Sequence, residues 1–429
     1  MVLKIFGNGF YQTKKKLINS WNLKINICFT TPCYQFDDSP TGGLPIHYKG
    51  LAEELANRGH KVTIIFADRF NAPIGKVDEK LNFKSIKFRY PKVLSLPIIS
   101  KVICQLGLSE KFRFSSDSKK ISSRLQNLNS ECKFDIIESP NNGACFDMVK
   151  NDQTCIRIAT TDKEHSLINN TEISPYLREL FRAEGKTFKN CRNLVTHTRA
   201  HRDKICKEYK LEPKNFTLIP LSVRIPKNTE LDVITKNQNL TILFVGRFEK
   251  RKGIDLLLAL IPKVLEKEPN AIFRLVGPDN NKLWQTKLSK EHPGLLKNVY
   301  FLGEKRGKEL DAEYRHCDIF IAPSRYESFG LIYAEAMSFA KPVIGTKIGG
   351  IPEVIDHEIN GFLCENENPE DFSNKLLILL ANHDLRIRMG KSGRKKAMEH
   401  FDFQNMVTRT EDYYREIMIN SKGEGLSVN

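Results

Sequence analysis

The sequence lacks the features that mark several large classes of protein. No apolar run reaches the roughly 18 residues that a membrane-spanning helix needs, and no low-complexity segment interrupts the chain. Ten cysteines occur without a Cys-x-x-Cys pair or a metal-type spacing, so we expect reduced, packed thiols rather than a disulfide framework or a zinc site. No basic stretch is interleaved with aromatic residues, which argues against a nucleic-acid partner. These absences favour a folded, globular protein.

Positive charge is unevenly distributed along the 429 residues. Residues 1–225 hold 37 lysines and arginines against 22 acidic residues, whereas residues 226–429 hold 30 against 29. Such an excess attracts anionic partners, for example acidic lipid surfaces or phosphorylated molecules. A solvated basic face without a partner is the alternative that the composition leaves open.

The first 22 residues form a basic N-terminal extension. Lysines 14–16 lie among apolar residues at near-helical spacing, namely Phe10, Tyr11, Leu17, Ile18 and Trp21. We interpret this segment as a short amphipathic helix for an anionic membrane interface. It does not resemble a secretion signal, because its lysines follow its apolar residues and it has no long apolar core. We therefore expect a cytoplasmic protein, with a peripheral position on the inner face of the membrane as one alternative.

Apolar segments alternate with helical patterns in two series. The first contains KINICFTT (24–31), a Gly-containing loop, a helical pattern and KVTIIFA (61–67), which together indicate a parallel β-α-β unit. FDIIES, TCIRIAT and NLVTHT are further expected strands of this series. The second series contains the expected strands TILFVGR, AIFRLVG, VYFLG, DIFIAPS and KPVIGT. The pattern is weak between the two series, which predicts a linker.

Two such series predict an α/β fold of two doubly wound, Rossmann-like domains that face each other across a cleft. After the basic extension (1–22) we expect an N-terminal domain over residues 23–225 and a linker over 226–238. A C-terminal domain follows over 239–405. Residues 406–429 are then a helix and tail, and we expect this helix to pack back on the N-terminal domain.

The loop GRFEKRKG follows the first strand of the second series. Gly246 permits a tight turn, Arg247 leaves the strand end, and Lys252 precedes a helix that we expect to begin near Gly253. Two cations beside a helix N-terminus suit a diphosphate, which arginine binds in bidentate fashion. The alternative is a plain basic loop.

The segment RYESFGLIYAE follows the strand DIFIAPS. We expect a helix from about Ser328, with Glu327 before it and the unpaired amides of Ser328, Phe329 and Gly330 in its first turn. Such amides stabilise an anion together with the helix dipole. Glu335 is expected about two turns further along, and carboxylate oxygens suit the vicinal hydroxyls of a sugar. The alternative is that Glu327 caps the helix and Glu335 is solvated.

Five segments in this order resemble the retaining glycosyltransferases of family 4, which have the GT-B fold. They are GRFEKRKG, FRLVGPD, VYFLG, HCDIFIAPSRYESFGLIYAEAMSFAKPVIGTKIGGIPEVI and NGFLCENENPEDF. The resemblance covers most of residues 240–400, and the glutamates Glu327 and Glu335, with seven residues between them, are the family's signature. The N-terminal half matches more loosely through KINICFTT, the TGGL loop and RGHKVTIIF. Residues 71–132 show no resemblance that we can name.

The resemblance implies roles for the matching residues. Arg247 and Lys252 would hold the donor diphosphate and stabilise the charge that develops on it, and Glu327 would bind hydroxyls of the transferred sugar. These three residues form the C-terminal part of the expected catalytic set. Glu335 would bind the nucleotide ribose. The expected donor-binding set is Gly42, Gly43, Gly246, Ser328, Phe329, Gly330, Leu331 and Glu335, in which Gly42 and Gly43 bring amides against the phosphate from the acceptor-side, N-terminal domain.

Two regions are less clear. A further loop with Gly349, Gly350, Pro352 and Glu353 is interpreted either as part of the site or as a plain turn. Other relatives have Ser at the position of Thr198, so whether Thr198 contacts the acceptor stays an open question.

The sequence departs from the family after the strand TCIRIAT. Many relatives carry a histidine there, where this chain has Ala159, Thr160 and Thr161. Asp162 and His165 follow, and we name these two as candidate catalytic residues that line the reaction centre. The alternative is that both lie on a surface loop.

The implied reaction transfers a hexosyl unit from a UDP- or GDP-sugar to a glycan or lipid-linked acceptor, as in the synthesis of cell-surface polysaccharides or glycolipids. Retention in this family is thought to need positioning and cations at the leaving phosphate. No Asp-x-Asp stands at a strand end, so we expect neither a metal ion nor a cofactor. The alternatives are a sugar-nucleotide epimerase of the same architecture, a sucrose- or glycogen-type synthase with a soluble acceptor, and a non-catalytic scaffold. The oligomeric state stays open.

Overall fold

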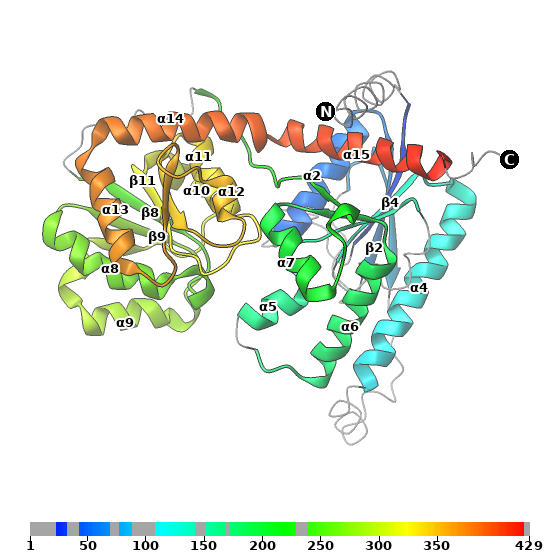
Figure 1. Cartoon of the computed structure of the whole chain (residues 1–429), viewed down its shortest axis with the longest axis horizontal. Helices are drawn as coiled ribbons and strands as arrows, with labels where there is room; N and C mark the ends of the chain where they lie inside the picture. Colours follow the sequence, from blue (N-terminus) through cyan, green and yellow to red (C-terminus); the bar gives the residue numbers. More distant parts are fainter. Residues whose placement is uncertain are drawn as a thin grey trace, which may run out of the picture. The chain divides into compact units, whose positions relative to one another are not determined.

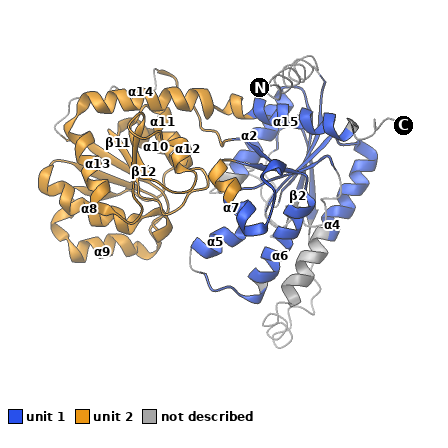
Figure 2. Cartoon of the chain, in the orientation of Figure 1, with its two compact units in different colours: residues 1–196, 204–219, 407–429 blue, residues 197–203, 220–406 orange. Residues whose placement is uncertain are grey.

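The structure is a computed structural model, and it describes residues 23–31, 43–68, 77–87, 108–141, 152–168, 171–228 and 239–423. The chain divides into two compact units, which are coloured separately in Figure 2. Unit 1 comprises residues 1–196, 204–219 and 407–429, and unit 2 comprises residues 197–203 and 220–406. The basic extension and most of the predicted linker lie outside the described residues.

Unit 1 contains a sheet of seven parallel strands in the order β3-β2-β1-β4-β5-β6-β7 among its described residues. The strands are β1 (Asn26–Thr31), β2 (Lys61–Asp68), β3 (Leu81–Lys87), β4 (Ile136–Pro140), β5 (Thr154–Arg157), β6 (Asn193–Thr196) and β7 (Phe216–Leu218). β4 and β5 are buried along their whole length, as expected for parallel strands with helices on both faces.

Helices follow most strands of unit 1 (Figure 1). They are α2 (Gly43–Asn57), α4 (Leu108–Cys132), α5 (Asp162–Ile168) and α6 (Pro175–Asn190). α7 (Arg199–Tyr209) begins in unit 2 and belongs to unit 1 from residue 204, and most of α15 (Phe403–Gly423), from residue 407, also belongs to unit 1. α6 begins with Ser174 as its N-cap, whose hydroxyl accepts from the Leu177 amide, and with Pro175 in its first turn. Both are standard signals of a helix start.

Unit 2 repeats the strand order of unit 1 with six strands, β10-β9-β8-β11-β12-β13, all parallel. They are β8 (Thr241–Val245), β9 (Ile272–Val276), β10 (Val299–Phe301), β11 (Ile319–Ala322), β12 (Val343–Thr346) and β13 (Gly361–Cys364). The apolar side chains of β8, β11 and β12 form the centre of one continuous core.

Helices cover the sheet of unit 2, with α8 beside α13 and α11 beside α14 (Figure 1). The helices are α8 (Ile254–Lys267), α9 (Leu283–Glu291), α10 (Gly307–His316), α11 (Leu331–Ser338), α12 (Ile351–Val354), α13 (Pro369–Ala381) and α14 (His383–His400). A short 3-10 turn, η4 (Lys250–Lys252), precedes α8.

The predicted fold class is confirmed, since both units are parallel-sheet α/β domains. The carboxyl ends of β8 and β11 adjoin in unit 2, because these strands pair directly. This is the point where the strand order reverses, and ligands of open parallel sheets bind at such a point. The loops that follow β8 and β11 therefore contain the candidate site.

Candidate active site in the C-terminal unit

The loop after β8 brings a lysine to the start of α8. Gly253 is the N-cap of α8 and has a left-handed backbone with φ of 72°. A Cβ at this position would lie 1.9 Å from the Pro323 carbonyl oxygen, so only glycine fits. Lys252 lies directly before it, and its alkyl chain passes over Gly246, where a Cβ would lie 3.6 Å from the Lys252 Cγ. Gly253 therefore fixes the backbone that follows Lys252.

The carboxylate of Glu327 is the centre of the site. Lys252 Nζ donates to Glu327 Oε1 over 2.6 Å, and the Ser324 hydroxyl donates to the same oxygen over 3.0 Å. Arg251 Nη1 lies 3.6 Å from the other oxygen, Oε2. Glu327 is 9% exposed. A buried carboxylate is stable only where cations and donors surround it in this way.

The electrostatics of Glu327 follow from these contacts. Burial alone would raise the pKa of the Glu327 carboxyl, but the charges of Lys252 and Arg251 outweigh burial and lower the pKa below its usual value. Glu327 is therefore ionised at neutral pH. The result is a fixed pair of opposite charges at the carboxyl end of the sheet, next to the first turn of α8.

Arg325 anchors the loop that carries Glu327. Its guanidinium binds the Asp255 carboxylate in bidentate fashion, over 2.7 and 3.0 Å, and it also pairs with Glu367 and donates to the Lys250 carbonyl. Asp255 lies in the first turn of α8. Arg325 therefore ties the loop after β11 to the helix start that carries Lys252.

The helix after Glu327 begins later than the sequence predicts. α11 starts at Leu331, so Ser328, Phe329 and Gly330 form the turn before the helix rather than its first turn. The reason is Gly330, which has a left-handed φ of 100° and interrupts the helix. Within the described chain, no acceptor pairs with the amides of Phe329, Gly330 or Leu331. These amides are available to an anion at a helix N-terminus, as expected.

Glu335 lies in the second turn of α11, which begins at Leu331. The buried Tyr314 hydroxyl donates to its Oε2 over 2.7 Å. Burial raises the pKa of the Glu335 carboxyl, and the hydrogen bond from Tyr314 only partly offsets this effect. Tyr314 thus fixes one carboxylate oxygen, and no described residue donates a hydrogen bond to the other.

The two predicted cations are not equivalent. The Arg247 side chain is 57% exposed, and its Nη2 lies 3.5 Å from Glu249 Oε1. Arg251, which sequence reasoning missed, occupies the place next to Glu327 and also donates to Glu249 over 3.0 Å. The sequence contains three basic residues in a row, at 250–252, but it does not show which two turn toward the glutamate.

The loop with Gly349 and Gly350 packs on the backbone of the Glu327 turn. The Gly350 amide donates to the Glu327 carbonyl, and a Cβ on Gly350 would lie 2.3 Å from the Ser328 carbonyl oxygen. Within unit 2, the Thr198 hydroxyl donates to the same Ser328 carbonyl over 2.7 Å. This loop therefore shapes the site by close backbone contact rather than by side chains.

Glu353 has a structural partner in unit 2. Its carboxylate accepts from the amides of Arg199 and Ala200 over 3.0 and 2.9 Å, at the start of α7. This acidic group satisfies amides that the helix itself leaves unpaired. Pro352 lies in the short helix α12 beside it.

Two family models match this chain, one over each half. The family model described as glycosyl transferases group 1 matches residues 227–396, and the one described as Glycosyltransferase Family 4 matches residues 41–225. Together they span both units. This chain belongs to the group 1 glycosyltransferases.

Relatives support this membership along the whole chain. An uncharacterized glycosyltransferase of Methanocaldococcus jannaschii is 24% identical over 406 residues, which are 90% of this chain and 97% of the relative. A D-inositol 3-phosphate glycosyltransferase of Corynebacterium jeikeium is 33% identical over 180 residues, 41% of this chain and 43% of that protein. The glycosyltransferase is thus a hexosyltransferase by family.

A solved structure shows the same fold. The sucrose-phosphate synthase of Thermosynechococcus elongatus superposes with a TM-score of 0.68 at 18% identity, over 92% of this chain and 100% of that chain. The expected GT-B fold of the glycosyltransferase is confirmed.

In unit 1 of the glycosyltransferase, the predicted residues lie in two places. Gly42 lies outside the described residues, and Gly43 is the first residue of α2. Asp162 is the first residue of α5, and its amide donates to Glu184 Oε1 over 3.3 Å. His165 lies one turn later and is exposed. Their catalytic roles stay predictions.

A capping box that the sequence analysis missed explains why α5 begins at Asp162. The Thr161 hydroxyl accepts from the Glu164 amide over 3.0 Å, and the Glu164 carboxylate accepts from the Thr161 amide over 2.9 Å. The pattern Thr-x-x-Glu at residues 161–164 was the available signal. It makes the segment after β5 a helix start rather than a loop.

Proposed function

We propose that this glycosyltransferase transfers a hexosyl unit from a UDP- or GDP-sugar to a glycan or lipid-linked acceptor, with retention and without a metal ion. The observation that supports this proposal is the cluster of Lys252, Glu327 and Arg251 at the carboxyl ends of β8 and β11. Its cations lie beside unpaired helix amides, an arrangement that suits a diphosphate bearing a sugar.

Each group then has a part in binding the donor. The exposed Arg247 and the fixed Lys252 bind the diphosphate, together with the amides before α11. Glu327 accepts hydrogen bonds from hydroxyls of the sugar. The free oxygen of Glu335 accepts from the ribose, while Tyr314 holds the other oxygen in place.

The reaction needs little beyond positioning and charge. The bond between the anomeric carbon and the diphosphate oxygen breaks, and the acceptor oxygen forms its bond to that carbon on the same face. The acceptor's proton passes to the departing phosphate oxygen. Arg247 and Lys252 stabilise the negative charge that grows on this phosphate, and they supply the positive charge that a divalent ion supplies in other transferases.

The acceptor is proposed to be anionic or lipid-linked, for the synthesis of cell-surface polysaccharide or glycolipid. The excess of positive charge lies in residues 1–225. No helix among the described residues is long and apolar enough to cross a bilayer, and we propose a cytoplasmic enzyme that associates peripherally with anionic lipid. Equal recovery of the protein in the supernatant with neutral and anionic vesicles at low salt would contradict the membrane part of this proposal.

Donor binding tests the proposal directly. A panel of UDP-, GDP- and ADP-sugars should include one that raises the midpoint of thermal unfolding, because a ligand at 100 times its Kd stabilises the folded state by about 2.7 kcal/mol. The matching nucleoside monophosphates serve as controls for base binding alone. The anomeric configuration of the product, read by NMR, then tests retention. Stabilisation by no nucleotide sugar would refute the donor class, and turnover of the donor sugar without any acceptor would favour the epimerase.

Metal independence has its own test. Turnover is expected to be unchanged by EDTA, because Arg247 and Lys252 carry the charge that the diphosphate needs. Turnover should be measured in parallel with added magnesium and manganese. A complete loss in EDTA that either ion restores would contradict the proposal that two cations replace a metal.

A further inference from the structure

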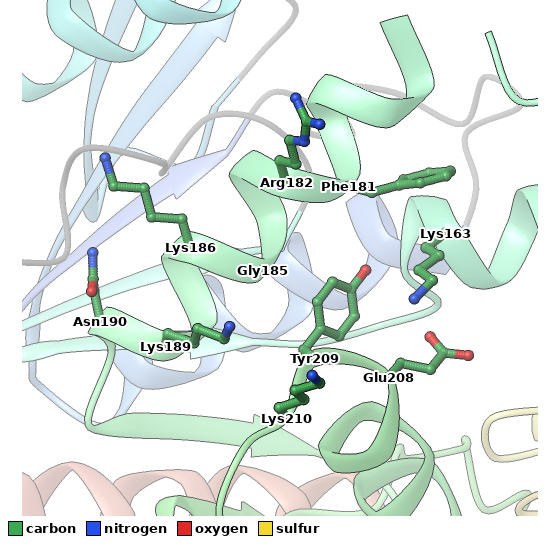
Figure 3. Close-up of a pocket in the computed structure, with 10 residues that line it drawn as sticks. All are labelled: Lys163, Phe181, Arg182, Gly185, Lys186, Lys189, Asn190, Glu208, Tyr209 and Lys210. Atoms are coloured by element: carbon green, nitrogen blue, oxygen red, sulfur yellow. The ribbon is translucent and has the colours of Figure 1, made fainter. Parts of the chain in front are cut away.

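A second concave site lies in unit 1 and shares no residue with the donor site. It is a pocket of about 580 Å³ between α5, α6 and the C-terminal end of α7. Figure 3 shows the ten residues that line it. This volume accommodates a small molecule.

The pocket is strongly basic. Five of its ten residues are cationic and one, Glu208, is acidic. The cations are Lys163, Arg182, Lys186, Lys189 and Lys210. Three of them, at positions 182, 186 and 189, are spaced by four and three residues on α6 and so lie on one face of that helix. Like charges at this spacing repel each other, and an anion bound between them would remove that repulsion.

Within the part of the chain that the structure describes, only one of these cations forms an ion pair. Arg182 pairs with Glu179 over 2.6 Å. By contrast, Lys186, Lys189 and Lys210 form no ion pair with any residue that the structure describes. Lys210 also has a left-handed backbone, with φ of 57°, at the end of α7.

The floor of the pocket is a specifically packed aromatic ring. A Cβ on Gly185 would lie 2.8 Å from Tyr209 Cδ1, so the ring of Tyr209 fits only because position 185 has no side chain. The Tyr209 hydroxyl donates to Glu184 over 2.6 Å. Lys163 Nζ lies 5.3 Å from the centre of the same ring, within the range of a cation–π contact. Ring and cation therefore hold fixed positions.

We propose that this pocket binds a phosphoryl group carried by a small polyol or sugar. The lysines supply charge-assisted hydrogen bonds to the phosphate oxygens. The rings of Phe181 and Tyr209 line the same pocket and offer apolar surface to the carbon skeleton of a polyol. The same chemistry occurs in a soluble phosphate ester and in a phospholipid headgroup. The site does not depend on the proposed donor site, because all of its residues belong to unit 1.

Calorimetry with glucose 6-phosphate tests the soluble source, and co-sedimentation with phosphatidylcholine vesicles, with and without phosphatidylglycerol, tests the lipid source. The full chain is compared with the double variant Lys186→Ala/Lys189→Ala. The control is Lys207→Ala/Lys214→Ala, which removes the same charge from exposed positions of unit 1 that do not line the pocket. Glucose shows whether the phosphate is needed.

The pocket variant is expected to bind the phosphate probe at least about tenfold more weakly than the wild type, whereas the control variant stays within about twofold. A selective loss with glucose 6-phosphate assigns a soluble ligand, and a selective loss with the anionic vesicles assigns a headgroup. Equal binding by both double variants, or no binding of either probe by the wild type, would overturn the proposal. If the double variant fails to fold, Lys210→Ala gives the same comparison at an exposed position.

Discussion

The two units share the strand order of their first six strands, but a buried glutamate on or after the corresponding strand, β4 or β11, has opposite surroundings in each unit. In unit 1, Glu138 lies on β4, the strand that pairs with the first strand across the reversal point. In unit 2, Glu327 follows β11, which has the same position in its sheet. Each glutamate is buried, and each binds a cation.

The hydrogen-bond network around Glu138 in unit 1 is closed to solvent. Arg157 donates to both oxygens of Glu138 over 2.7 and 3.1 Å, and the Tyr414 hydroxyl of α15 donates to Glu138 Oε2 over 2.7 Å. Arg157 and Glu138 are at most 1% exposed. Burial lowers the pKa of Arg157, but the neighbouring Glu138 carboxylate outweighs burial and raises this pKa above its ordinary value. No ligand has access to a pair sealed in this way.

The network of unit 2 is open by comparison. The side chains of Lys252 and Glu327 are 14% and 11% exposed, and Arg247 in the loop after β8 is 57% exposed. The same topology therefore provides a place for a buried charge pair, and the surrounding residues decide its use. A pair covered by a helix is closed to ligands, whereas a pair left partly open is accessible to the proposed donor.

The strongest test removes the cation of the closed network. Arg157→Met should lower the free energy of unfolding by about 3–5 kcal/mol, because it leaves the Glu138 charge buried without a cation. Denaturant unfolding measures the change. The double variant Glu138→Gln/Arg157→Met removes both charges and should recover part of the loss. An unfolding free energy of the single variant within about 1 kcal/mol of the wild type would mean that the pair is not sealed.

The second prediction concerns a carboxylate that is buried without a cation. Burial raises the pKa of Glu184 to about 7, although Tyr209 and Asn141 donate to it. The unfolded chain loses this proton near its ordinary pKa of about 4.3, so the folded state binds more protons between these values. The wild type should therefore lose about 3 kcal/mol of stability relative to Glu184→Gln as the pH rises from about 5 to 8.

Urea unfolding of both proteins across this pH range measures the difference. Glu172→Gln, at an exposed position of the same unit, is the matched control and should run parallel to the wild type. A constant difference between the wild type and Glu184→Gln would show that Glu184 is ionised throughout. Its burial would then resemble that of Glu327, and the contrast between the two carboxylates would disappear.

The third prediction addresses the cations of the open network. Lys252→Ala and Arg247→Ala should each lower kcat by at least about tenfold, or roughly 1.4 kcal/mol, because each removes charge that stabilises the transition state. Lys252→Ala should also lower the free energy of unfolding, because it removes the cation that pairs with the buried Glu327. Arg247→Ala should not lower it, because the Arg247 side chain is exposed. Denaturant unfolding of both variants separates the loss of stability from the loss of kcat. Rates close to wild type in both variants would rule out the diphosphate site.

The smallest expected effect separates the two glutamates of unit 2. Glu335→Gln should weaken binding of the bare nucleoside diphosphate by about 1 kcal/mol, the scale of one hydrogen bond. Glu327→Gln should leave that binding nearly unchanged and reduce turnover, because its proposed partner is the sugar. Calorimetry and steady-state rates measure the two quantities. The reverse pattern would exchange the assigned roles.

The sequence predicted unit 2 more completely than unit 1, for a physical reason. Its strands β8 to β12 are short and mostly apolar, and glycine, proline or a charged residue follows each within two positions, so these boundaries can be predicted locally. β3 and α4 lie within residues 71–132, where no pattern was recognised. β3 reads LNFKSIK, and four of its residues are polar or basic because it is the edge strand of its sheet.

The candidate site was predicted by residue type but not by partner. Glu327, Lys252 and Glu335 were named from the sequence, whereas the contacts of Arg251, Arg325 and Tyr314 were not. These contacts join residues 21 to 76 positions apart, and local spacing contains no information about them. The late start of α11 was missed because the effect of Gly330 depends on its backbone angle, which the sequence does not give.

The return of the chain from unit 2 to unit 1 has a consequence for synthesis on the ribosome. Tyr414 completes the network of Glu138, but it is made after all of residues 220–406. Domains fold as their residues emerge, and usually the N-terminal one is first. Here unit 2 is complete while unit 1 still lacks its last helix. In a nascent chain, the Glu138–Arg157 pair of unit 1 therefore lacks the hydrogen bond from Tyr414 until translation is almost complete. A premature stop before residue 414 would leave this pair permanently without Tyr414.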